Sequence, residues 1–215
     1  MTLERTGAAA LIGGTLAMLG VMALHPSGVP HNADADRVIL LGIVVHGVAI
    51  AVAPLLTFGM FALSRSIGFA KSASALAFFF YLFGAITVML AATMSGLVAP
   101  RLIQSMMSAS GAEKDLLHGL LRLEWYLNQS FATLHVGFFS AAIALYALAW
   151  PEKGILAAAI QIAGFIVGIG VFAWLVSGTL TLNVHGMGAV VVAQGAWFVL
   201  AAVGLFVRKP SADTI

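Results

Sequence analysis

The chain contains no cysteine among its 215 residues and has few charges. The missing cysteine excludes disulfides, thiolate metal sites and a cysteine nucleophile. Charged residues make up only 8% of the chain, against about 25% in soluble domains. The basic residues are scattered and the formal net charge is only +2, so nucleic acid is not an expected partner.

Several motifs that carry chemistry are also missing. The sequence has no glycine-rich phosphate loop, which argues against nucleotide binding and hydrolysis, and no His-Glu-x-x-His zinc-protease motif. The apolar runs contain no acidic cluster, arginine or lysine. A cation pump, a voltage sensor and a retinal-type Schiff base are therefore not expected.

Apolar residues dominate what remains. They form 61% of the chain, and the mean hydropathy is +1.06. A soluble domain of this size could not bury so much apolar surface, so the lipid bilayer must be the solvent. The predicted fold is an all-α integral membrane protein, with residues 1–215 in one polytopic domain. Six apolar runs of about 20 residues or more predict six transmembrane helices in one bundle, arranged as three helical hairpins: roughly 7–25, 38–63, 73–99, 125–150, 154–180 and 185–207.

The first run is predicted to be a retained helix, because His25-Pro26-Ser27-Gly28 after it is a poor signal-peptide cleavage site. The distribution of Lys and Arg favours cytoplasmic termini. With that orientation the cytoplasmic segments hold Arg5, Arg65, Lys71, Lys153, Arg208 and Lys209, and the outer segments hold Arg37, Arg101, Lys114 and Arg122. Such a chain is typical of the bacterial inner membrane.

The loop between the third and fourth spans carries a helical pattern. Leucines recur within Ala112–Leu123 and charges fill the other positions. This pattern predicts either a short interfacial helix or an outward extension of the fourth span. Ser110 and Glu113 resemble a capping box at its start.

Three histidines mark a candidate site. His46, His135 and His185 each lie near the outer end of an apolar run, with glycine close behind. They stand about 16 to 23 residues from the inner ends of their helices, or roughly 24 to 35 Å. An ionisable group inside a membrane usually marks function. The three imidazoles are therefore predicted to face one another in the outer half of the bundle.

Two kinds of site are consistent with these residues. His46 and His135 have the better-matched depths and could hold a b-type haem between helices. Alternatively, some subset of His25, His46, His135 and His185 could bind a copper, zinc or iron ion, with His25 and His185 forming a shallower pair. Histidine with thioether sulfur suits copper(I), and several methionines are predicted on the outer side: Met94, Met106, Met107 and Met187.

The fourth span has a polar face. Glu124, Asn128 and His135 are four and seven residues apart, so they share one side of a helix. This face predicts an access path from the outer surface to His135. The same pattern also suits a helix whose first turns lie among lipid headgroups.

Each residue has a structural interpretation as well. His31 and His118 fall in polar loops and are expected to be solvated, and buried histidines are often neutral groups bonded to a helix carbonyl.

The first functional hypothesis is a metal or haem site serving redox chemistry, metal handling or metal-assisted chemistry on a lipophilic substrate. The alternatives are a small-solute or proton transporter that uses the fourth span, and a non-catalytic subunit or assembly factor of a membrane complex. Gly164-xxx-Gly168 allows close helix packing, within the chain or in a homo-oligomer.

Overall fold

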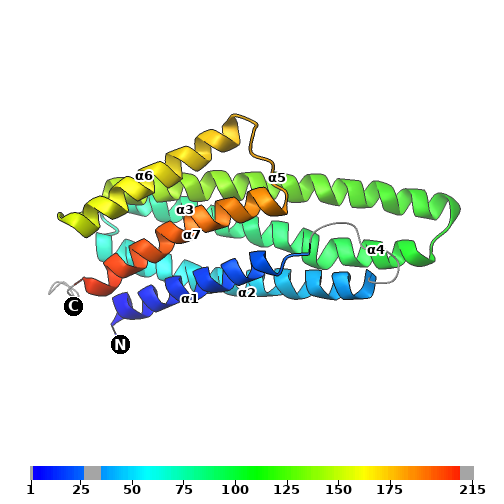
Figure 1. Cartoon of the computed structure of the whole chain (residues 1–215), viewed down its shortest axis with the longest axis horizontal. Helices are drawn as coiled ribbons and strands as arrows, with labels where there is room; N and C mark the ends of the chain where they lie inside the picture. Colours follow the sequence, from blue (N-terminus) through cyan, green and yellow to red (C-terminus); the bar gives the residue numbers. More distant parts are fainter. Residues whose placement is uncertain (1, 27–34, 209–215) are drawn as a thin grey trace.

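The computed structural model describes residues 2–26 and 35–208, and that part of the chain is helical without strands. Figure 1 shows the helices lying side by side in one elongated bundle. A five-residue π-helical turn, Met94–Val98, joins α3 to α4. The α-helices are α1 (Leu3–Ala23), α2 (Ala35–Ile67), α3 (Ser72–Thr93), α4 (Ala99–Ser108), α5 (Gly111–Ala149), α6 (Ile155–Val176) and α7 (Val184–Val207).

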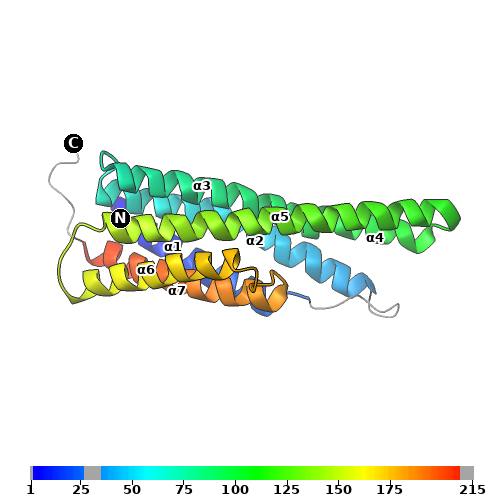
Figure 2. The same ribbon diagram turned by 90° about the horizontal axis from the view of Figure 1, so that it is seen from above.

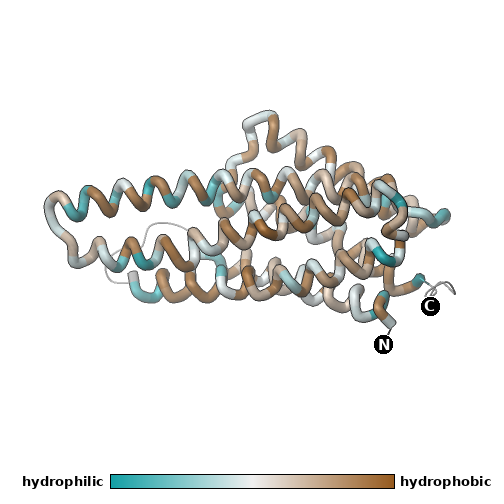
Figure 3. Tube along the Cα trace, turned by 180° about the vertical axis from the view of Figure 1, so that it is seen from behind, coloured by the Kyte–Doolittle hydropathy of each residue, from teal (hydrophilic) through white to brown (hydrophobic). Residues whose placement is uncertain are grey.

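Six helices in the described residues are long and apolar enough to cross a membrane, the third being the continuous stretch Ser72–Ser108. The prediction of six transmembrane helices in one bundle is therefore confirmed. Figure 3 shows hydrophobic residues through the middle of the bundle and hydrophilic residues gathering toward its ends. For Ala112–Leu123, the second of the two predicted alternatives is confirmed. The segment is helical, but it is the outward extension of α5 rather than a separate helix.

The helices form a closed ring. Each packs against its neighbours in the chain, with α3 contacting α5 as well as α2, and α1 packs against α7 to close the circle. Each predicted hairpin is present as a packed pair, and the α5–α6 and α1–α7 contacts join the hairpins. The glycines predicted for close packing are used inside this ring: a Cβ on Gly168 would lie 2.7 Å from the Ser140 carbonyl oxygen of α5.

The helices differ in length, and this difference creates the site. At 1.5 Å per residue, the 39 residues of α5 span about 58 Å, whereas the 21 of α1 span about 32 Å. Figures 1 and 2 show α2, α4 and α5 extending past α1, α6 and α7 at the end of the bundle away from the start of α1 and the end of α7. This end is called the distal end below, and the other is called the proximal end.

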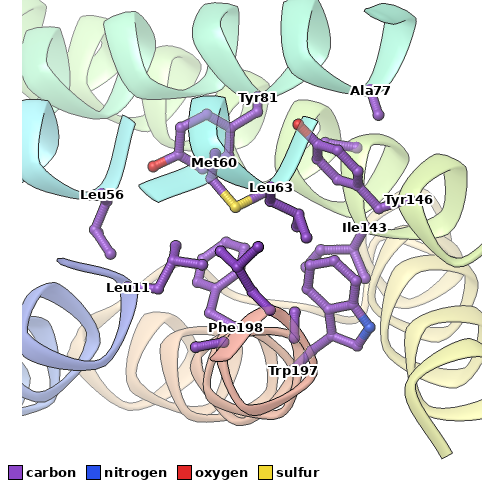
Figure 4. Close-up of a cluster of buried hydrophobic side chains, with 14 of the residues drawn as sticks. Leu11, Leu56, Met60, Leu63, Ala77, Tyr81, Ile143, Tyr146, Trp197 and Phe198 are labelled. Atoms are coloured by element: carbon purple, nitrogen blue, oxygen red, sulfur yellow. The ribbon is translucent and has the colours of Figure 1, made fainter. Parts of the chain in front are cut away.

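The proximal half holds the hydrophobic core. Figure 4 shows side chains from α1, α2, α3, α5 and α7 converging there, including Leu11, Met60, Tyr81, Tyr146 and Trp197. All five are at most 1% exposed. Because these side chains pack the interior of the proximal half, a cavity at the distal end would end against them.

Candidate functional site

A cavity of about 470 Å³ lies where the short helices end against the long ones. We call it the distal chamber. Its walls come from α1, α2, α3, α5, α7 and the connector between α6 and α7. Exposed Trp125 and Asn183 are among its lining residues, so the chamber is reached from the surface. Its polar lining residues are His25, His46, Ser95, Glu124, Asn128, Gln129, His135 and Asn183.

His25 and His46 meet in this chamber. Their Nε2 atoms are 3.3 Å apart, and the rings are perpendicular with centroids separated by 4.9 Å. The Nδ1 atom of each ring faces a backbone carbonyl oxygen: Pro26 at 3.0 Å from His25, and Gly42 at 2.7 Å from His46. A carbonyl can only accept a hydrogen bond, so these two bonds form when Nδ1 of each ring carries the proton.

That proton placement determines the electrostatics of the pair. A neutral imidazole carries one N–H, and its other nitrogen is then a lone-pair acceptor. If both rings are neutral, two lone pairs on Nε2 face each other at 3.3 Å. The contact becomes favourable when a cation lies between the two nitrogens, either a shared proton or a metal ion. A cation between the two nitrogens would remove this repulsion.

Local structure fixes both rings. His25 comes directly after the C-cap of α1, where its backbone N–H donates to the Met22 carbonyl. His46 bonds to the carbonyl one turn earlier in α2. On its other side, Gly96 of the π-helical turn approaches so closely that a Cβ there would lie 2.3 Å from the Cβ of His46. π-Helical turns occur frequently at functional sites.

His135 lies deeper in the same chamber. It is 4% exposed, and its Nδ1 is 3.2 Å from the Gly84 carbonyl oxygen of α3. Its ring meets Phe139 edge to face, with centroids 4.3 Å apart. His135 also lines a smaller inner pocket of about 40 Å³, shared with Thr15, Tyr81 and Gln194. It therefore stands at the junction between the two spaces.

Glu124 and Asn128 both line the chamber, but their environments differ. The Asn128 Nδ2 donates to the Ala91 carbonyl oxygen at 3.1 Å and to the Ser95 hydroxyl. Asn128 thereby ties α5 to the start of the π-helical turn. Glu124 is 7% exposed, and its Oε1 has no hydrogen-bond partner. Their predicted role as an access path stays a prediction.

The larger histidine sets predicted from sequence are not assembled. Among the residues that the structure describes, no three His, Asp or Glu side chains are close enough to hold one metal ion. His185 is exposed and absent from the chamber lining, because the first turn of α7 presents Val184 and Met187 instead. The direct contact joins His25 to His46, whereas the sequence favoured His46 with His135 and His25 with His185.

The methionines that line the chamber differ from the set that the sequence suggested for the outer side. Met187 lines the chamber, together with Met18 and Met22 of α1, whereas Met94, Met106 and Met107 do not. Sequence reasoning missed the two α1 methionines. The signal was their spacing, since they precede His25 by seven and three residues and so share its helix face. His118 is exposed on the extension of α5 as expected, and His31 lies outside the described residues.

Comparison with protein-family models, curated proteins and solved structures finds no match for the chain.

Proposed function

We propose that this protein binds a transition-metal ion of the copper or zinc class in its distal chamber, with His25 and His46 as ligands. The observation that carries the proposal is the 3.3 Å separation of the two Nε2 atoms. Zinc–imidazole bonds are about 2.0–2.1 Å long in tetrahedral sites. Two such ligands at the tetrahedral angle lie about 3.3 Å apart, so the pair forms one edge of the coordination polyhedron.

The surroundings of the two rings support the same conclusion. A metal-bound histidine almost always donates its second ring N–H to a carboxylate, carbonyl or water, which fixes the ring and its tautomer. Both rings have this anchor, on Pro26 and on Gly42. The free nitrogens are thus presented as lone-pair donors on the same wall of the chamber.

The remaining ligands would come from the chamber itself. Met18, Met22 and Met187 line it, and thioether sulfur selects copper(I) among these metals. Water or a substrate atom could fill an open position, as in catalytic zinc sites. Haem is less well supported, because the His46 Nε2 faces the His25 ring directly and leaves no space for a porphyrin between them.

The test is direct metal binding by the protein in lipid nanodiscs. Copper(I) and Zn²⁺ are each added, excess metal is removed by dialysis, and the bound metal is measured by elemental analysis. One metal ion per chain is expected. His25→Ala and His46→Ala should each reduce retention at least tenfold, whereas His185→Ala should not, because His185 is exposed outside the chamber. Retention by His46→Ala equal to that of the parent, or no retention by the parent, would contradict the proposal.

A second candidate, transport of a proton or small solute, is favoured by one observation. The buried His135 lines both the distal chamber and the inner pocket. An imidazole at that junction could relay a proton inward, because one ring nitrogen can accept a proton while the other donates one. A flux assay in liposomes compares the parent with His135→Ala. This candidate requires a flux that the substitution removes, and unchanged flux would exclude it.

A further inference from the structure

The distal chamber contains a second polar feature that the histidine pair does not use. Glu124 is 7% exposed and lines the chamber, and its Oε1 has no hydrogen-bond partner. The structure records no ion pair for it either, since the one salt bridge among the described residues joins Arg208 to Glu152. A buried carboxylate without a cation is costly, so a partner from outside the chain would stabilise it.

The metal ion of the proposed site is a poor candidate for that partner. If Glu124 lay within reach of the metal at His25 and His46, the three side chains would form a metal-binding group. Among the described residues no such group exists. Glu124 therefore belongs to a separate part of the chamber.

Asn128 lies one turn after Glu124 on α5 and also lines the chamber. Residues four apart are neighbours on a helix surface, so Asn128 lies beside Glu124. The Nδ2 of Asn128 is already bound to the Ala91 carbonyl. None of the hydrogen bonds in the described part of the chain uses its Oδ1, which is an acceptor. A carboxylate beside an amide oxygen offers only acceptors, which suits a ligand that is cationic and donates several hydrogen bonds.

Between its polar residues, the chamber has apolar walls. Val88, Val184 and Val191 contribute to its walls, with the three methionines named above. Trp125 adds an aromatic ring next to Glu124 in sequence, and such a ring attracts cations through its face. The volume of about 470 Å³ falls within the usual range for small-molecule sites, about 300–1,000 Å³.

From these observations we propose that Glu124 binds the ammonium group of an amphiphilic organic amine, whose apolar body occupies the distal chamber. Three N–H donors of a primary ammonium match the acceptors of Glu124 and Asn128. This site goes beyond the metal site and does not depend on it.

The test compares two ligands of equal size on the full chain in nanodiscs: 2-phenylethylammonium and the uncharged 2-phenylethanol. Binding is measured by isothermal titration calorimetry, with empty nanodiscs subtracted to remove partitioning into lipid. The parent should bind the amine at least tenfold more tightly than the alcohol. Glu124→Gln should bind both with equal affinity. Glu113→Gln is the matched control, because Glu113 is exposed near the start of the same helix.

The outcomes separate this inference from the metal proposal. His46→Ala should lose metal and keep the preference for the amine, whereas Glu124→Gln should do the reverse. Equal affinity of the parent for both ligands overturns the inference without needing any variant. Loss of metal from Glu124→Gln as large as that from His46→Ala would also overturn it, because Glu124 would then be a metal ligand. A parent that binds no metal but prefers the amine leaves the inference standing and removes only the metal proposal.

Discussion

The two ends of the bundle each contain a glutamate, and the partners of the two carboxylates differ. At the proximal end, Glu152 accepts from the Arg208 guanidinium, which also donates to the Ser66 hydroxyl at 2.5 Å. At the distal end, Glu124 has no cationic partner among the described residues. Glu152 is neutralised by the chain itself, so it holds helices together. Glu124 is left for a ligand.

The same contrast extends to the surrounding space. The proximal half is tightly packed, and polar side chains in its core have partners there: the Tyr146 and Ser64 hydroxyls are 2.6 Å apart, and the Trp197 indole donates to the Ile160 carbonyl at 3.0 Å. The distal half contains the chamber. In lipid, helices associate through close packing and hydrogen bonds. The filled half therefore supplies the stability that allows the other half to remain open.

Trp197→Ala should have the largest effect on this comparison. The side chain is 1% exposed, and its removal leaves a cavity in the proximal core, at a cost of about 3–5 kcal/mol. Trp125→Ala is the matched control, because Trp125 is 55% exposed at the distal chamber. Unfolding in mixed micelles with increasing denaturant measures both. Equal losses of stability would show that the halves do not differ as described.

Gly96→Ala should come next and should act mainly on metal binding. The new methyl group would meet the Cβ of His46 at 2.3 Å, so the ring must move. Displacing a metal ligand, or removing the groups that orient it, typically lowers metal affinity by about 10–100-fold. The extra methyl group also overpacks this contact, which costs about 1–3 kcal/mol of stability. Gly47→Ala provides the control, because nothing lies within 4 Å of a Cβ there. Metal retention by dialysis would reveal the difference, and equal retention by the two variants would contradict the proposed role of His46.

Tyr146→Phe should have a smaller effect, confined to stability. It removes the hydrogen bond to Ser64, which is worth about 0.5–1.5 kcal/mol. Metal binding should stay unchanged. Tyr126→Phe, at an exposed position of the same helix, should change neither property. A clear loss of metal from Tyr146→Phe would mean that the two halves are coupled.

Arg208→Gln should have the smallest effect. Arg208 is 11% exposed but Glu152 is 38% exposed, and an ion pair that is partly open to solvent contributes about 1 kcal/mol or less. Because Arg208 lies at the proximal end and does not line the chamber, the variant should bind the metal and the amine normally. Arg122→Gln is the exposed control on α5. Unfolding and calorimetry on the same preparations would check both statements, and a loss of amine binding would contradict the second.

Sequence patterns predicted the architecture well and the site only in part. Six apolar runs were sufficient for six helices, because in lipid a spanning segment must satisfy its own backbone hydrogen bonds. His46 and His135 both line the distal chamber, since the position of a residue along a helix follows from counting residues. The partner of His46 was not predicted. It depends on how α1 ends beside α2, and no periodicity encodes that contact.

Partners of other buried polar groups show the same division. Gln194 is a polar residue within an apolar run and therefore needs a hydrogen-bond partner, which the structure supplies as the Ser140 hydroxyl at 3.2 Å. Ser140 carries no sequence signal of its own. The π-helical turn at Met94–Val98 was equally hidden, although it brings Gly96 against His46 and Ser95 to Asn128.

What the sequence determined by itself was the solvent, the number of spans and the position of each polar side chain along its helix, because these follow from hydropathy and from a fixed rise per residue. The tertiary structure decided which side chains face one another. It paired His25 with His46, left His185 on the surface and left Glu124 without a partner. The physical reason is that packing of small residues sets how each helix is rotated about its axis and which helices it contacts. This packing depends on all six helices of the bundle together.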